Sequence, residues 1–279
     1  MPTSGRARDL LVRPSEMTGR TDRTDHAPAP KEAPPDAFGR IAREYELGRP
    51  LWPQELLDRV LAEVGLSSDA AVLDLGAGTG KLTRALVPRF SRVVAVEPDP
   101  EMLAVLGEVV PGADARAGSA ESIPLDDGEV DAVFSAEAFH WFASDESVGE
   151  IVRVLRPRGA LVILWNIGLE YDDMGEEAEA VISEMFERGG EPGIGRVLSG
   201  EWRRPLESAP FEELREADEE RELFATRDEW IANMLSVSSI AHQPEEERDA
   251  FADRLRELVL ADRKVRRLVR TVAYWTRLA

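Results

Sequence analysis

The stretch AVLDLGAGTGKL, residues 71–82, decides the fold of this chain. It starts with an apolar run that holds a single acid, Asp74, and three glycines then follow at positions 76, 78 and 80. The apolar run predicts a strand that is buried on both faces. The spaced glycines predict a turn whose backbone closely approaches a ligand. In an open parallel sheet, ligands bind beyond the carboxyl ends of the strands, so we expect the binding site at this turn.

Short apolar runs and helical segments alternate around this turn. The apolar runs that predict strands occupy residues 71–75, 92–97, 113–118, 130–136 and 159–165. The segments that predict helices between them occupy residues 80–90, 100–110 and 146–156. Strands that alternate with helices form a parallel sheet with helices on both faces. We therefore expect an α/β fold with a doubly wound, mostly parallel, Rossmann-like sheet.

The flanking segments predict an N-terminal entry helix and a C-terminal helical cap. Upstream, Pro53 suits the first turn of a helix and Gly65 suits its end. Downstream of Trp165, the segments that predict helices occupy residues 170–190, 227–240 and 245–264. The charged segment 211–226 can contain a strand, and the β-branched and aromatic segment 269–278 predicts a last one. We expect this half to cover the sheet with helices and to complete its edge.

Residues 1–37 are polar and rich in proline, which predicts a disordered tail. Residues 38–279 then form one domain, with a ligand-binding core over 38–168 and a cap with the sheet edge over 169–279. The tail has no apolar segment typical of a secretory signal. No apolar run of the sequence reaches the length of a membrane span.

The composition limits the kinds of partner. The net charge of −20 disfavours nucleic acids and anionic membranes, because both repel an acidic surface. The chain has no cysteine, and its three histidines lie far apart without the spacing of metal ligands. We expect a cytoplasmic protein that acts on a small molecule and needs no metal; the sequence leaves its oligomeric state open.

The glycine turn disfavours a ligand that binds through a phosphate. A P-loop requires a hydroxyl residue after the lysine, and Leu82 stands there. A dinucleotide fold prefers G-x-G-x-x-G, whereas the third glycine comes one residue earlier here. Asp74 repels a pyrophosphate but accepts a hydrogen bond from an ammonium group. The turn therefore favours a ligand with an amine and a positive centre.

Later strand ends indicate the rest of this ligand. Glu97 ends the second strand, where an acid accepts hydrogen bonds from both hydroxyls of a ribose. Met102 begins the next helix and can lie on an adenine face, and Ala120 and Glu121 can meet the adenine edge. Together these residues describe an adenosine joined to a cationic amino acid, which is S-adenosylmethionine.

These segments resemble the class I S-adenosylmethionine-dependent methyltransferases, and most closely the small-molecule group called type 11. The segments that carry the resemblance are VLDLGAGTGKLT (72–83), VVAVEPDPEML (93–103), VDAVFSAEAFHWF (130–142) and EIVRVLRPRGALVILWN (150–166). Upstream, YELGRPLWP (45–53) is similar to the entry segment of trans-aconitate methyltransferase-like enzymes. The resemblance covers residues 38–168 well and 211–277 weakly, and it does not extend to residues 170–205.

The resemblance implies roles for these positions. Gly76, Gly78 and Gly80 would let the backbone approach the methionine part of the cofactor, with Asp74 near its amino group. Glu97 would hold the ribose, and Met102, Ala120 and Glu121 would frame the adenine. Tyr45 and Arg49 would lie on the entry helix, where Arg49 would pair with the cofactor carboxylate. Many relatives have an aspartate where this chain has Ser119, so Glu121 or backbone amides would recognise the adenine amino group.

Three aromatic positions have two interpretations each. His140 follows the fourth strand, where it can act as a general base for the methyl acceptor. Alternatively it packs structurally against the cofactor, since a sulfonium is already a strong leaving group and alignment can suffice. Trp141 and Trp165 either line an apolar acceptor pocket or belong to the core.

The expected reaction is direct methyl transfer to a small molecule, with oxygen as the favoured acceptor atom, in specialised metabolism. Two alternatives remain at this point. One is an enzyme of the same fold that binds S-adenosylmethionine and catalyses a cyclisation or rearrangement. The other is an NAD-dependent oxidoreductase, which the glycine spacing and Asp74 disfavour.

Overall fold

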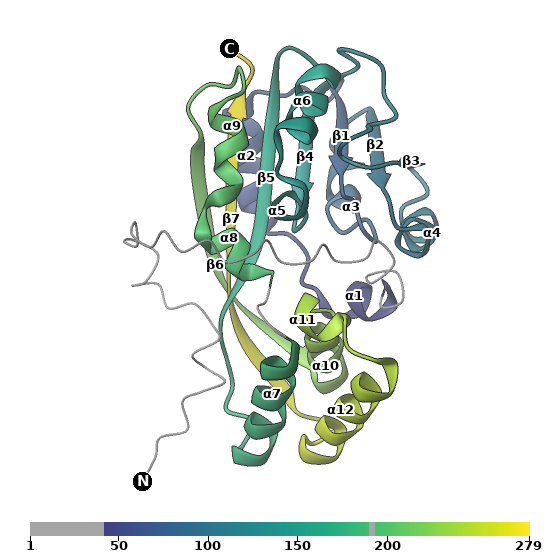
Figure 1. Ribbon diagram of the computed structural model, residues 1–279, viewed down its shortest axis with the longest axis vertical. Helices are drawn as coiled ribbons and strands as arrows, with labels where there is room; N and C mark the ends of the chain where they lie inside the picture. The colour runs from purple at the N-terminus through teal and green to yellow at the C-terminus, as the bar shows by residue number, and fades with distance from the viewer. Residues whose placement is uncertain (1–41, 190–192) are drawn as a thin grey trace.

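The computed structural model describes residues 42–189 and 193–279 (Figure 1). The tail predicted over residues 1–37 lies outside the described residues. Within them, no helix has the length and apolar character needed to cross a membrane.

A seven-stranded sheet in the order β3-β2-β1-β4-β5-β7-β6 forms the centre of the molecule. Its strands are β1 (Ala71–Leu75), β2 (Arg92–Glu97), β3 (Asp114–Ala117), β4 (Val130–Ala136), β5 (Leu155–Tyr171), β6 (Arg215–Thr226) and β7 (Lys264–Arg277). The first five in spatial order are parallel, and β7 is antiparallel to both β5 and β6. The predicted doubly wound, mostly parallel sheet is confirmed.

Helices cover both faces of this sheet and build the cap. They are α1 (Ala42–Gly48), α2 (Gln54–Val64), α3 (Thr83–Leu86), α4 (Pro100–Val109), α5 (Phe139–Phe142), α6 (Asp145–Val154), α7 (Glu176–Gly189), α8 (Ile194–Ser199), the 3-10 helix η4 (Glu201–Arg203), α9 (Arg204–Glu207), α10 (Arg227–Leu235), α11 (Ser238–Ala241) and α12 (Glu245–Leu258).

The strand side chains alternate between two cores. Val72 of β1 packs with α2 and α3 on one face, and the next residue, Leu73, packs with α6 on the other. This alternation follows from the two-residue period of a strand. It explains why β1 consists wholly of buried residues and was recognisable from its sequence.

Several predicted boundaries were wrong. The helix predicted over 80–90 is only the short α3, because the loop turns through Gly80 with a φ of +86° and Pro88 cannot continue a helix. The strand predicted to end at Trp165 continues to Tyr171, since it pairs with β7 along that whole length. The helix predicted over 227–240 breaks into α10 and α11, where Val237 is extended.

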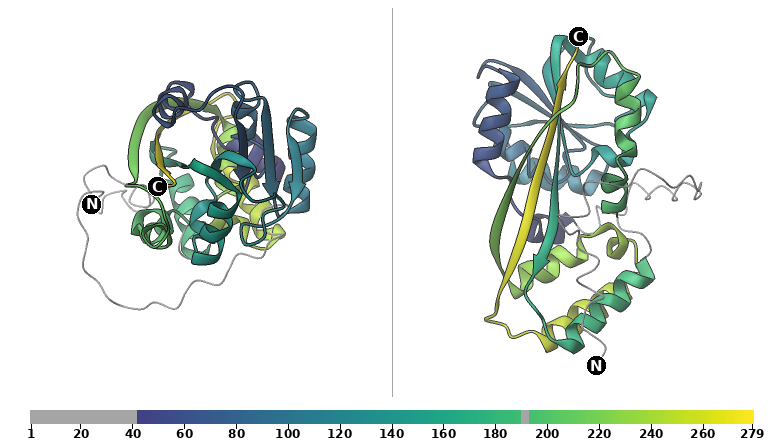
Figure 2. Two further views of the ribbon diagram at one scale, coloured as in Figure 1. Left: turned by 90° about the horizontal axis from the view of Figure 1, so that it is seen from above. Right: turned by 90° about the vertical axis from the view of Figure 1, so that its left-hand side faces the viewer.

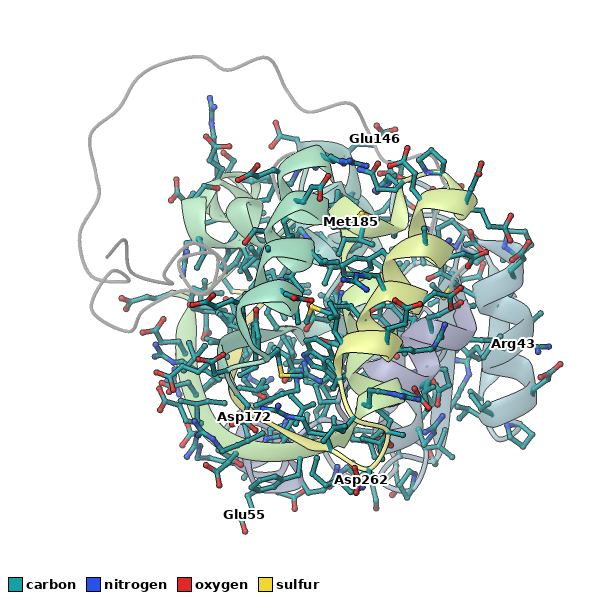
Figure 3. The ribbon with its side chains drawn as sticks, turned by 90° about the horizontal axis from the view of Figure 1, so that it is seen from below. Arg43, Glu55, Glu146, Asp172, Met185 and Asp262 are labelled. Carbon is teal, nitrogen blue, oxygen red and sulfur yellow. The ribbon has the colours of Figure 1, made fainter. Side chains whose placement is uncertain are left out.

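The strands β5, β6 and β7 extend beyond the other four strands and carry the cap (Figure 2). The cap helices α7, α10 and α12 share a third apolar core with the ends of β5 and β7, including Trp230, Phe251 and Val265. Figure 3 views this cap from below, with Met185 of α7 labelled. The cap therefore lies at the carboxyl end of the parallel strands, where a ligand is expected.

Candidate active site

The glycine loop after β1 has a backbone that only glycine adopts easily. Gly76, Gly78 and Gly80 have φ values of +71°, +56° and +86°. A Cβ on Gly76 would lie 2.6 Å from that of Ala138, and one on Gly80 would lie 2.9 Å from Cγ2 of Val110. A Cβ on Gly78 would meet no atom within 4 Å. The first and third glycines are thus required by packing, whereas the middle one faces open space.

Glu97 at the end of β2 holds this loop in place. Its Oε2 accepts a hydrogen bond from the Gly78 N–H at 2.8 Å, and its Oε1 accepts one from the Asp99 N–H at 3.0 Å. Burial raises the pKa of Glu97 to about 7. Each carboxylate oxygen has a further lone pair, so Glu97 can still accept hydrogen bonds from a ligand.

Asp74 lies wholly buried beneath the same loop. Its Oδ2 accepts a hydrogen bond from the Thr83 hydroxyl at 2.6 Å, whereas its Oδ1 meets no donor among the described residues. Burial raises the pKa of Asp74 to about 7. A buried oxygen without a donor is costly, and a ligand that brings a donor would relieve that cost.

Glu46 of α1 joins that helix to the glycine loop. Its carboxylate accepts hydrogen bonds from the Thr79 hydroxyl at 2.8 Å and from Arg84 Nη2 at 2.6 Å. Lys81 Nζ donates to the Glu46 carbonyl oxygen and lies 3.7 Å from Oε2 of Glu46. These contacts fix α1 beside the loop, so that the side chains of the next turn reach the site.

Tyr45 lies on α1, whereas Arg49 directly follows its last residue, Gly48, so the prediction that both lie on the entry helix was wrong for Arg49. The Arg49 guanidinium donates to the hydroxyl and the carbonyl oxygen of Ser236, both at 2.9 Å. Its central carbon lies 5.3 Å from the centroid of the Tyr45 ring, within the range of a cation–π contact. Burial raises the pKa of Tyr45, so its hydroxyl stays protonated at neutral pH.

A cavity of about 190 Å³ lies between the ends of β4, β5 and β7 and the cap. Its polar lining side chains include Tyr45, Arg49, Glu137, His140, Asn166, Glu170, Asn233, Ser238 and Arg267. Its apolar and aromatic lining side chains include Trp141, Tyr171, Phe186, Ile194, Val197, Trp230, Met234, Val237, Leu268 and Val269. An apolar cavity with a few convergent polar groups is typical of a small-molecule site.

His140 lines this cavity but is poorly suited to be the predicted base. Its Nδ1 accepts a hydrogen bond from the Trp165 indole N–H at 3.0 Å, which leaves the hydrogen of the neutral ring on Nε2. Burial, together with the charges of Arg196 and Arg49, lowers the pKa of His140 to about 3. The ring therefore offers an N–H donor to the cavity and has no free lone pair.

The two tryptophan predictions have different outcomes. Trp141 lines the cavity, with the Arg196 guanidinium 4.9 Å from its ring centroid. The prediction that Trp165 lines the acceptor pocket was wrong. Trp165 is fully buried, packs against Trp202 and Tyr274, and contributes only through its hydrogen bond to His140.

The comparisons with known proteins fit this geometry. A family model described as a methyltransferase domain matches residues 73–163. An uncharacterized methyltransferase of Mycobacterium tuberculosis is 40% identical over 223 residues, which cover 80% of this chain and 85% of the relative. Another, of Schizosaccharomyces pombe, is 35% identical over 222 residues, with 79% and 85% covered. The chain belongs to the class I S-adenosylmethionine-dependent methyltransferases.

A solved structure agrees with this methyltransferase fold. It is described as a type II methyltransferase from Anaeromyxobacter dehalogenans, has a TM-score of 0.60 and is 25% identical. The similarity covers 82% of this chain and 98% of that one. The predicted family and cofactor are thus confirmed, and the NAD-dependent oxidoreductase is set aside. The trans-aconitate methyltransferase-like subgroup stays a prediction.

The residues of the glycine loop fit S-adenosylmethionine. The open space at Gly78 admits a ligand against the backbone, and Glu97 and the unpartnered Oδ1 of Asp74 provide acceptors for hydroxyl and ammonium groups. Around the predicted adenine position, Met102 and Ala120 are buried, whereas Glu121 is exposed. Contact of these three with adenine stays a prediction.

Several polar residues of the cavity escaped the sequence prediction, among them Glu137, Asn166, Glu170, Asn233 and Arg267. Glu137 follows β4 directly with a φ of +58°, a strained backbone for a residue with a side chain, and its Oε1 accepts from the Asn166 N–H at 2.7 Å. Its place after an apolar strand is the signal that also marks Glu97, and it was available in the sequence. Arg267 of β7 has no such signal, because it lies among other arginines in a charged segment.

Proposed function

We propose that this methyltransferase methylates an oxygen atom of a small molecule held in the cavity between the sheet and the cap. The observation that carries this proposal is the cavity itself, which lies at the carboxyl ends of the strands and is lined mainly by apolar side chains. A net charge of −20 further disfavours a nucleic acid as the acceptor, and we propose a cytoplasmic setting in specialised metabolism.

We assign the cofactor contacts to the loop and the entry helix. Glu97 would hold the ribose hydroxyls, Asp74 would face the amino group, and Arg49 would meet the carboxylate. The three glycines would let the backbone approach the methionine part. When bound, S-adenosylmethionine supplies a methyl group on a positively charged sulfur.

Glu137 is the group best placed to receive a proton from an acceptor hydroxyl. It lines the cavity, and burial raises its pKa above the usual range, although the charge of Arg49 opposes this. A carboxylate with a raised pKa is a better base than one in water. The Nε2–H of His140 would orient the acceptor by donating a hydrogen bond, and the cap would exclude water.

A partial relative supports oxygen as the acceptor atom. A malonyl-[acyl-carrier protein] O-methyltransferase of Methylococcus capsulatus is 43% identical over 98 residues. The match covers 33% of this chain and 36% of that enzyme.

Calorimetry with S-adenosylhomocysteine, followed by a screen of hydroxyl-bearing small molecules, tests the proposal. We expect binding by the wild-type protein, and S-adenosylhomocysteine as a product with at least one acceptor. Glu97→Ala should weaken the binding by about tenfold or more, because the ribose loses two charge-assisted hydrogen bonds. Glu101→Ala, at an exposed position of α4, serves as the control.

Two outcomes would contradict the proposal. One is a protein that does not bind S-adenosylhomocysteine. The other is a product formed while S-adenosylmethionine is not consumed, which would favour the cyclisation or rearrangement alternative.

A further inference from the structure

Arg267 brings a positive charge into the cavity and forms no ion pair with a carboxylate of the described residues. Its only hydrogen bond among the described residues runs from Nη1 to the Gly48 carbonyl oxygen at a long 3.5 Å. No ion pair of the described residues includes Arg267. Burial and the charge of Arg49 lower its pKa to about 10, so it remains charged at neutral pH.

The neighbouring residue shows that acids lie beside this strand, on β6 and at the end of β5. Arg266 pairs with Glu222 at 2.9 Å, Asp172 at 3.5 Å and Glu170 at 3.8 Å. Arg267 differs from Arg266 in that it lies in the cavity, buried among the lining side chains, and has no such carboxylate partner among the described residues. A buried charge without a partner is costly, and it is tolerated where a ligand supplies the opposite charge.

A second donor without an acceptor lies near Arg267. Tyr171 is the partner of Arg267 in the β5–β7 pairing, and its ring lies 6.0 Å from that of Trp230. The buried indole N–H of Trp230 has no acceptor among the described residues. The side chains of Arg267 and Trp230 both line the cavity. Glu170, the residue before Tyr171, also lines the cavity, and its carboxylate lies 3.8 Å from Arg266. The Arg267 guanidinium and the Trp230 N–H are therefore two donors of this region that have no carboxylate partner among the described residues.

Arg267 lies away from the group that we assign to proton removal. Asn166, whose N–H donates to Glu137, pairs with Thr271, four residues along β7 from Arg267. Four residues of a strand span about 13 Å. This separation of the two backbone positions leaves room for an anion at Arg267 and an oxygen at Glu137 to belong to two different groups of one acceptor.

We propose that the acceptor carries a carboxylate, separate from its methylated oxygen, which pairs with the Arg267 guanidinium. A planar guanidinium binds a carboxylate through two parallel hydrogen bonds, and the apolar walls strengthen such a pair by excluding water. This inference rests on the proposed function, because it specifies the substrate class of the same cavity.

Calorimetry on the protein saturated with S-adenosylhomocysteine tests this assignment. The probes are 4-hydroxyphenylacetate and 10-hydroxydecanoate, each compared with its carboxamide. We expect at least one carboxylate to bind about tenfold more tightly than its amide, as a charge-assisted pair predicts. Arg267→Gln should abolish this preference, and Arg267→Lys should retain part of it. Arg266→Gln is the matched control, since it removes a neighbouring charge that already has carboxylate partners.

Equal binding of each carboxylate and its amide, or binding of neither, would overturn the proposal, as would a preference that survives in Arg267→Gln. The wild-type comparison alone can overturn the proposal even if Arg267→Gln does not fold, and Arg267→Lys then tests whether the preference belongs to Arg267. Titration of S-adenosylhomocysteine into the same wild-type protein distinguishes a failure of the proposed function from a failure of the role of Arg267. If S-adenosylhomocysteine does not bind, the proposed function is contradicted. If it binds normally and the carboxylates are not preferred, only the role of Arg267 is contradicted.

Discussion

Two polar residues of the candidate active site, His140 and Glu137, have opposite hydrogen-bonding roles. His140 is held as a neutral donor by the Trp165 indole, with a pKa of about 3. Glu137, three residues earlier, is an acceptor whose pKa burial raises above the usual range. Burial disfavours the charged form of each, which weakens the imidazole as a base and strengthens the carboxylate. We therefore propose Glu137, and not His140, as the proton acceptor.

Replacing Glu137 tests this division of roles. With an acceptor found by the screen, we expect Glu137→Gln to lower kcat by about 100-fold, because a general base is lost. The affinity for S-adenosylhomocysteine should stay unchanged. Wild-type kcat should rise as the pH increases through the pKa of Glu137, since only the ionised carboxylate accepts a proton. The measurement is kcat as a function of pH.

His140→Gln provides the comparison for that profile. Its kcat should depend on pH as the wild-type value does, because the ring of His140 does not titrate near neutral pH. A wild-type profile that follows a group near pH 6.5 and disappears in His140→Gln would restore the histidine as the base and exclude Glu137.

At the scale of elements, Glu46 connects α1 to the cofactor loop. Glu46 contacts Thr79, Lys81 and Arg84, which lie in or directly after the glycine loop. On its other side, α1 packs on α10, and Arg49 is bonded to Ser236 at the end of that helix. The entry helix thus bridges the loop and the cap, so its position affects access to both.

Weakening this bridge should speed the loss of the ligand from the loop. For Glu46→Gln we expect the dissociation rate of S-adenosylhomocysteine to rise by about tenfold, because charge-assisted hydrogen bonds become neutral ones. Stopped-flow displacement measures this rate. Glu44→Gln removes a carboxylate of the same helix that forms no ion pair with the described residues, and the ligand should dissociate from this variant at the wild-type rate. Equal rates for wild-type and Glu46→Gln would show that α1 does not control release.

At the scale of the whole molecule, the sheet and the cap depend on the same strands. The ends of β5 and β7 belong to the core of the cap, while their other halves pair within the sheet. We propose that the described chain is one folding unit for this reason. Buried acids at its centre, Asp74 and Glu97, then couple the stability of the whole protein to pH.

Asp74 should make the ligand-free protein less stable as the pH rises. Its pKa is about 7 in the folded protein and 3.8 in an unfolded chain. Between these values the folded state binds more protons, so the free energy of unfolding falls with increasing pH and levels off above pH 7. Glu97 acts in the same direction, and His140 in the opposite direction below pH 6.5.

Asp74→Asn isolates this contribution. The stability of the variant relative to wild type should increase by about 2 kcal/mol between pH 5.5 and pH 7.5, because asparagine does not titrate. Urea unfolding at the two pH values gives the difference. A relative stability that does not change with pH would mean that Asp74 is already ionised in the folded protein at pH 5.5.

The sequence alone determined the parts of this protein whose signals are local. The apolar strand before Gly76, the glycine spacing and Glu97 at the next strand end are each read from a few consecutive residues, and they predicted the sheet, the turn and the cofactor. The pattern of apolar residues did not predict where strands end. The strand predicted to end at Trp165 continues, because its length depends on pairing with β7.

Only the tertiary structure decided what faces the acceptor. Arg49, Glu137 and Arg267 come from distant parts of the chain and meet because long strands and α1 close over the same cavity. The hydrogen bond between Trp165 and His140 likewise joins residues of two elements and fixes the tautomer. Burial and partners set the charge state of these groups, and neither is encoded in the spacing of neighbouring residues.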